Sequence, residues 1–123
     1  MTLQEIKDVL RCEDLCGEAA LHSEVTTVFA ADLLSDVLAY AKQGTLLLTG
    51  ITNQQVVRTA EMLELLAIIF VRGKRPDAET INLAKSKNIP MLTTKYILFE
   101  TCGRLYNCGL RGCIESVKDD TAR

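Results

Sequence analysis

The sequence predicts a three-layer α/β domain, in which a mainly parallel sheet of about four strands carries helices on both faces. Two observations support this fold class. Short apolar runs, some rich in β-branched residues, alternate with longer segments whose apolar residues recur at helical spacing. The runs are nearly continuous in apolar residues, which is typical of parallel strands that are buried on both faces.

Four segments have the composition of strands, and each is followed by a helical pattern. We expect strands at residues 25–31, 45–49, 67–71 and 89–93. A single domain is expected over residues 1–112, because a chain of 123 residues is long enough for one core. The chain turns polar from Arg111, and residues 113–123 are expected to form a polar C-terminal tail.

Capping residues mark the expected helices. The first helix covers about residues 3–12 and opens with a capping box formed by Thr2 and Glu5. Each of the other helices follows a strand. The second is capped by Asp32 and ended by Gly44, and the third opens with the capping box Thr52-Asn53-Gln54-Gln55 and runs to about residue 65. The fourth starts at Pro76 and Asp77, and the last covers residues 95–108, capped by Thr94 and ended by Gly109.

Composition disfavours several classes of partner. The net charge is -2, so no overall basic field attracts nucleic acid or anionic membranes. The longest apolar run, residues 65–71, is too short to cross a bilayer. No signal peptide is visible, so we expect a cytoplasmic protein whose five cysteines are reduced.

Polar residues follow each predicted strand, and ligands of open parallel sheets bind beyond these carboxyl ends. Residues 49–53 lead into a helix N-terminus, where free amides favour an anion. Residues 72–75 carry three positive charges, to which Lys95 adds a fourth. Ordinary helix caps and solvated surface would show the same residue types. The candidate crevice for a phosphate-bearing small molecule is lined by Asp32, Thr49, Gly50, Thr52, Asn53, Arg72, Lys74, Arg75 and Thr94.

The cysteines and acids give weaker signals. Cys102, Cys108 and Cys113 have the spacing C-x5-C-x4-C, which matches neither zinc nor iron–sulfur patterns. Buried apolar cysteines are the simpler interpretation, and a metal site built from these three is the alternative. The chain has no P-loop and no G-x-G-x-x-G fingerprint. Asp32 and Asp36 are the only candidate bases near the crevice, and we expect no enzyme.

A set of scattered positions resembles a known family. The set comprises Asp32-Leu33-Leu34-Ser35-Asp36-Val37, Gly44 before a strand, Gly73 and Pro76 after a strand, Phe99-Glu100-Thr101-Cys102-Gly103-Arg104-Leu105-Tyr106, and Gly109-Leu110. In these positions the chain resembles stand-alone DRTGG-domain proteins, from about Leu3 to Gly112. The family commonly has a glycine pair where this chain has Thr27 and Val28.

The resemblance implies a regulatory or accessory role. Similar domains occur in phosphate acetyltransferases and in CBS-domain pyrophosphatases, and the fold is similar to the N-terminal domain of HPr kinase/phosphorylase. Kinase activity is not implied, because that activity belongs to a separate P-loop domain. The leading prediction is a non-enzymatic ligand-binding module that forms a homodimer and binds a phosphorylated small molecule or a partner enzyme, with no cofactor identified. Two alternatives are open: a cysteine-based metal or iron–sulfur accessory protein of redox (hydrogenase-like) metabolism, and a dimerisation or protein-interaction module without a ligand.

Overall fold

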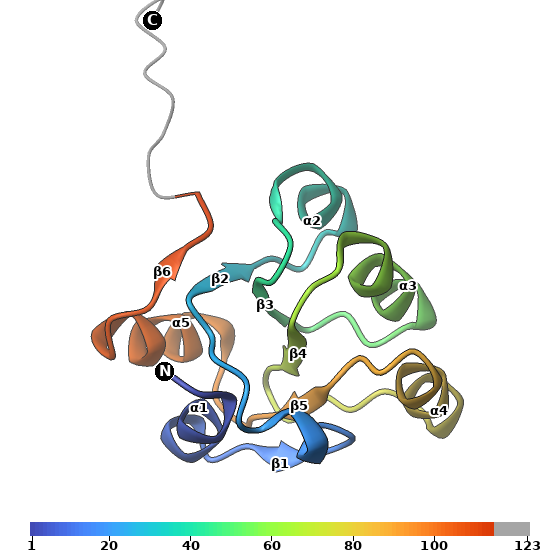
Figure 1. The fold of residues 1–123 in the computed structure, drawn as a ribbon, viewed down its shortest axis with the longest axis horizontal. Helices are drawn as coiled ribbons and strands as arrows, with labels where there is room; N and C mark the ends of the chain where they lie inside the picture. Colours follow the sequence, from blue (N-terminus) through green and yellow to red (C-terminus); the bar gives the residue numbers. More distant parts are fainter. Residues whose placement is uncertain (115–123) are drawn as a thin grey trace, which may run out of the picture.

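The computed structural model describes residues 1–114, which form a six-stranded sheet between two layers of helices (Figure 1). The strand order is β1-β5-β4-β3-β2-β6. Only the β1–β5 pair is antiparallel within these residues. The strands are β1 (Glu13–Asp14), β2 (Thr27–Ala30), β3 (Leu46–Thr49), β4 (Ala67–Phe70), β5 (Met91–Thr93) and β6 (Arg111–Gly112).

The α/β class and the mainly parallel sheet are confirmed, but the expectation of about four strands was wrong. The two additional strands, β1 and β6, are two-residue segments at opposite edges. Their polar composition has no strand character, and they pair only because the edges of the sheet offer free backbone groups. Arg111 was expected in a frayed tail and instead pairs with Thr27. Residues 115–123 of the expected tail lie outside the described residues.

The order of the strands explains how the helices divide between the two faces. The helices are α1 (Leu3–Leu10), α2 (Leu34–Tyr40), α3 (Gln54–Leu63), α4 (Ala78–Ser86) and α5 (Leu98–Asn107), with a short 3-10 turn, η1 (Glu18–Ala20). From β2 to β5 the chain moves steadily across the sheet, so right-handed crossovers bring α2, α3 and α4 to one face. Figure 1 shows α1 and α5 together on the other face. The chain therefore changes face after β5.

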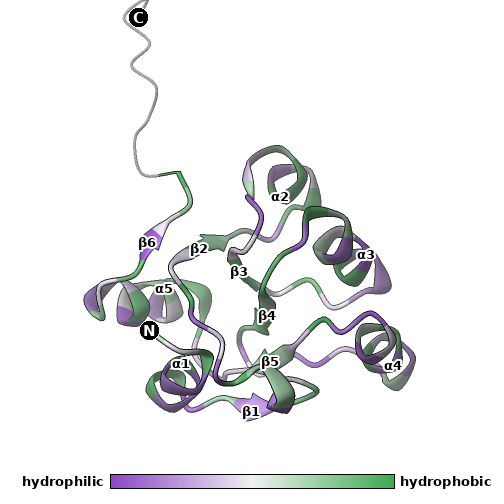
Figure 2. Cartoon of the chain, in the orientation of Figure 1, coloured by the Kyte–Doolittle hydropathy of each residue, from purple (hydrophilic) through white to green (hydrophobic). Residues whose placement is uncertain are grey.

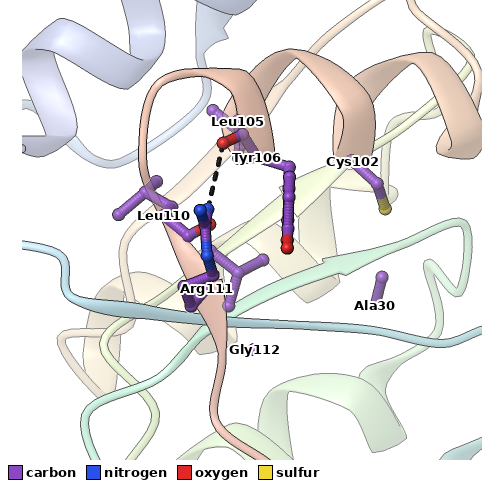
Figure 3. A pocket seen from close by; sticks show the side chains of 8 residues that line it. Ala30, Cys102, Leu105, Tyr106, Leu110, Arg111 and Gly112 are labelled. Atoms are coloured by element: carbon purple, nitrogen blue, oxygen red, sulfur yellow. Dashed lines mark hydrogen bonds between the residues drawn. The ribbon is translucent and has the colours of Figure 1, made fainter. Parts of the chain in front are cut away.

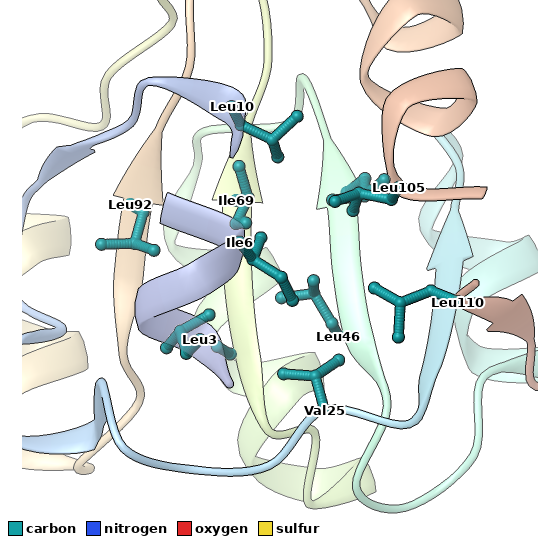
Figure 4. Packing of buried hydrophobic residues seen from close by; sticks show 11 residues of the cluster. Leu3, Ile6, Leu10, Val25, Leu46, Ile69, Leu92, Leu105 and Leu110 are labelled. Atoms are coloured by element: carbon teal, nitrogen blue, oxygen red, sulfur yellow. The ribbon is translucent and has the colours of Figure 1, made fainter. Parts of the chain in front are cut away.

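Alternate side chains of β3 pack against opposite helix layers. Leu46 and Leu48 belong to the cluster that includes Leu3 of α1 and Leu105 of α5, shown in Figure 4, whereas Leu47 packs with residues of α2, α3 and α4. The central strands β3 and β4 are mainly apolar, as the green in Figure 2 shows. Burying a leucine fully contributes roughly 1.5–3 kcal/mol, so these two clusters hold the layers together. Within residues 1–114, no helix has the length and apolarity needed to cross a membrane.

Two of the expected caps are present. The Thr2 hydroxyl accepts from the Glu5 amide at 3.2 Å, and the Glu5 carboxylate accepts from the Thr2 amide at 2.8 Å. Asp77 accepts from the Thr80 amide at 2.8 Å. Hydrogen bonds from the Thr2 amide and the Thr2 hydroxyl lower the pKa of the Glu5 carboxyl, and bonds from the Thr80 hydroxyl and amide lower that of Asp77. Both caps form between groups only three residues apart.

Three other capping predictions were wrong. Helix α2 begins after Leu33, and Asp32 does not cap it. Helix α5 begins at Leu98 rather than at residue 95, and Thr94 does not cap it. Asn53, not Thr52, caps α3. In the first two cases the side chain makes hydrogen bonds to a distant element instead, which local spacing does not reveal.

Candidate functional site at the carboxyl ends of the strands

Asp32 joins the carboxyl ends of β2 and β3. Its Oδ1 accepts a hydrogen bond from the backbone amide of Gly50 at 2.6 Å and a longer one from the Thr49 hydroxyl at 3.4 Å. The Thr49 hydroxyl also accepts from the amide of Ile51 at 3.1 Å. The first residues after β2 and β3 are therefore fixed relative to each other, which makes this corner a rigid one.

Two basic side chains converge on Gly50. A Cβ at this position would lie 3.2 Å from Arg72 Nη2, 3.3 Å from Asp32 Oδ1 and 3.7 Å from Lys74 Cδ. We call Asp32, Thr49, Gly50, Arg72 and Lys74 the Gly50 cluster. Gly50 was predicted to line the ligand crevice, and in the structure the side chains of Arg72 and Lys74 occupy the space beside it. No ion pair of either side chain is found within residues 1–114.

The loop that carries these cations is held by its own backbone. Arg72 and Gly73 both have positive φ, at 59° and 68°. Their amides donate to the carbonyls of Tyr96 and Thr94, each at 2.8 Å. These bonds tie the segment after β4 to the segment after β5, so the left-handed turn that aims Arg72 is fixed by a second element.

Arg75 and Thr94 lie apart from the Gly50 cluster. Arg75 Nη1 forms an ion pair with Glu13 Oε1 at 2.8 Å, on the β1 side of the loop. Thr94 is only 1% exposed, and its hydroxyl donates to the carbonyl of Leu10 at 2.7 Å. Asn53 caps α3 with its side chain. The nine predicted residues thus do not line a single crevice.

A pocket of about 260 Å³ adjoins Arg75 and Thr94. The other residues that line it are Arg11, Cys12, Glu13, Gly73, Thr93 and Lys95. Arg11, Cys12 and Glu13 were not among the predicted site residues. They follow α1, and only the antiparallel pairing of β1 with β5 brings them to this edge. No sequence signal marks that pairing.

The cysteines form no metal centre in the part of the chain that the structure describes. No group of three His, Cys, Asp or Glu side chains is placed to hold a metal ion there. All five cysteines are free thiols. Burial raises the pKa of the Cys12 thiol to about 12, and it also raises the pKa of Cys16 and Cys102. Cys108 is exposed at the end of α5, and Cys113 donates to the carbonyl of Tyr40.

An apolar pocket of about 160 Å³, shown in Figure 3, lies at the β6 edge of the sheet, which is the edge opposite to β1. It is bounded by β2, α5 and β6, with Cys102 and Tyr106 of α5 among its walls. Arg111 of β6 stacks on the Tyr106 ring at 3.9 Å and donates to the Tyr106 carbonyl at 3.2 Å. Nearby on α5, Phe99 is 83% exposed. This surface is apolar, in contrast to the charged edge of the sheet.

Residues 5–108 match the family described as the DRTGG domain. The chain belongs to the DRTGG domain family. This assignment confirms the resemblance seen in the scattered motif positions. No curated protein matches the chain.

A solved structure supports the fold of this DRTGG domain. It is the crystal structure of the CBS and DRTGG domains of the regulatory region of Clostridium perfringens pyrophosphatase, complexed with the activator diadenosine tetraphosphate. The TM-score is 0.73 and the sequence identity is 23%, over 97% of this chain and 51% of the other. The chain therefore spans about half the length of that neighbour, and the similarity shows the fold.

Proposed function

We propose that this DRTGG domain is a non-enzymatic regulatory or accessory module, located in the cytoplasm, that binds a phosphate-bearing small molecule at the carboxyl ends of its strands. The observation that supports this best is the convergence of Arg72 and Lys74 on Gly50. In a chain of net charge -2, two cations with no ion-pair partner among residues 1–114 share one rigid corner. Such a corner attracts an anion in preference to a neutral ligand.

Asp32 adds a further requirement on the ligand. Its Oδ1 is used by Gly50 and Thr49, and its exposed carboxylate adds negative charge beside the two cations. A ligand that places a hydroxyl or amino donor near Asp32 and its phosphate near Arg72 satisfies both charges. The regulatory region of the pyrophosphatase was crystallised with diadenosine tetraphosphate, a molecule that carries both kinds of group.

The test is calorimetric titration of the protein with diadenosine tetraphosphate. We expect the double variant Arg72→Gln/Lys74→Gln to bind at least about tenfold more weakly than the wild type, because two charge-assisted contacts are lost. The matched control is Lys42→Gln/Arg58→Gln, which removes the same charge from exposed positions away from the cluster. The proposal would be refuted if both double variants lost the same affinity for diadenosine tetraphosphate, or if the wild type did not bind this nucleotide.

A second candidate function is self-association through α5. Phe99 is 83% exposed and Tyr106 is 58% exposed, which is unusual for large aromatic side chains on one helix. Phe99 and Tyr106 line one shallow hollow of α5 together with Cys102, Gly103 and Asn107. Two copies of α5 in antiparallel contact around a two-fold axis would bring Phe99 of one copy against Tyr106 of the other.

Sedimentation velocity tests this homodimer. We expect Phe99→Ser/Tyr106→Ser to shift the protein towards monomer, whereas Met62→Ser, at a residue that is 64% exposed on α3, leaves the state unchanged. A wild-type protein that is monomeric at high concentration would exclude this candidate. The cysteine-based metal function has no supporting observation among the described residues.

A further inference from the structure

The pocket of about 260 Å³ lies where the chain changes face. The segment after β4 leads to α4 on one face, and the segment after β5 leads to α5 on the other (Figure 1). Neighbouring segments that diverge in this way open a crevice at the carboxyl ends of parallel strands, and ligands of open α/β sheets bind there. By contrast, the segments after β2, β3 and β4 all turn to the same face, and their side chains fill the Gly50 corner.

The charges around this pocket favour an anion. Arg11, Arg75 and Lys95 contribute three positive charges, and Glu13 contributes one negative charge. The Glu13 carboxylate is paired with Arg75, whereas Arg11 and Lys95 form no ion pair within residues 1–114. Cys12 adds no negative charge near neutral pH, because burial raises its pKa to about 12.

The walls of the pocket are fixed before any ligand arrives. The Thr94 hydroxyl donates to the Leu10 carbonyl and accepts from the Tyr96 amide, so it holds the end of α1 against the segment after β5. The Thr93 hydroxyl donates to the Lys74 carbonyl at 2.7 Å, and the Gly73 amide donates to the Thr94 carbonyl. Binding there costs little ordering of backbone, which favours affinity for a small ligand.

We propose that this pocket is a second anion site, which binds a phosphate group through Arg11 and Lys95. The site is separate from the Gly50 cluster, because none of the residues that line the pocket belongs to that cluster. Glu13 orients Arg75 at its edge rather than binding the ligand. The site requires only a single phosphate group, so inorganic phosphate is a sufficient probe.

Amide-resolved NMR titration with inorganic phosphate at fixed ionic strength tests this site directly. We expect saturable shifts of the Cys12, Gly73 and Lys95 amides. The double variant Arg11→Gln/Lys95→Gln should raise the dissociation constant measured at these amides at least about tenfold. The control Lys42→Gln/Arg58→Gln should leave that constant within about twofold, because its exposed positions lie outside the pocket.

The outcomes separate this proposal from the proposed function. The second site is overturned if the pocket amides do not shift on addition of phosphate, or if the wild type and Arg11→Gln/Lys95→Gln bind phosphate with equal affinity. This conclusion holds even if Arg72→Gln/Lys74→Gln still weakens the binding of diadenosine tetraphosphate. Responsive pocket amides support the second site even if that nucleotide does not bind. The NMR spectrum reports whether each variant is folded, and the single variant Lys95→Glu, at an exposed position, provides a second test by charge reversal.

Discussion

The carboxylate of Asp32 accepts a hydrogen bond from the backbone amide of Gly50 at 2.6 Å, across 18 residues of sequence. This bond ties the segment that follows β2 to the segment that follows β3. It also explains why α2 has no side-chain cap, since the residue best suited to that role is engaged elsewhere.

Removal of the Asp32 carboxylate should cost stability. Asp32→Ala leaves the Gly50 amide without its partner, and we expect the free energy of unfolding to fall by about 1–2 kcal/mol. Asp32→Asn keeps an accepting oxygen and should lose less. Urea denaturation measures the difference, with Asp36→Ala as the control at an exposed position in the first turn of α2. A loss in Asp36→Ala as large as that in Asp32→Ala would contradict the prediction.

Loss of the Thr94 hydroxyl should lower the free energy of unfolding more than loss of the hydroxyl of an exposed threonine. Thr94→Val conserves the shape of the side chain but leaves the Leu10 carbonyl and the Tyr96 amide unpaired near the pocket. We expect a loss of about 1–3 kcal/mol in the free energy of unfolding. Thr26→Val, at an exposed position, is the control and should change stability by less than about 0.5 kcal/mol. Calorimetric melting of the two variants checks this.

Gly103 offers a stabilising substitution. It lies inside α5, and a Cβ there would meet no atom within 4 Å. Gly103→Ala should raise the free energy of unfolding by roughly 0.5–1 kcal/mol, because alanine loses less backbone entropy in a helix. Gly50→Ala is the informative contrast, since its Cβ would lie 3.2 Å from Arg72 Nη2. Chemical denaturation should find no gain in that variant, and a loss of stability in Gly103→Ala would show that the site is crowded.

Cys12 should react slowly with alkylating agents. Burial raises its pKa from 9.0 to about 12, so very little of the reactive thiolate exists at pH 8. Cys108 is exposed and should be alkylated first. Peptide mapping by mass spectrometry after timed iodoacetamide treatment gives the two rates. Comparable rates in the folded protein would mean that Cys12 is not buried as described.

The same pKa shift gives a pH dependence of stability. The folded state holds the Cys12 proton more tightly than the unfolded state, so the contribution to stability is complete below about pH 9 and is lost as pH rises towards about 12. Cys12→Ser lacks this titration in that range. Thermal melting of both proteins between these pH values should show a steeper decline in the wild type than in the variant.

The sequence by itself determined the alternation of strands and helices and the caps formed by near neighbours. Apolar runs such as β3 and β4 must be buried on both faces, and this requirement alone predicts parallel strands with helical crossovers. The Asp77 cap is equally local, because donor and acceptor are three residues apart. For these features the information needed is contained within a short stretch of the chain.

Only the tertiary structure decided which polar residues meet. Thr94 bonds to Leu10 across 84 residues, and Arg75 pairs with Glu13 because β1 lies beside β5. Strands of two residues contain too few side chains to show a pattern, so β1 and β6 were not predictable. The division of the expected crevice into the Gly50 cluster and a separate pocket follows from the change of face after β5, which depends on how the whole chain packs.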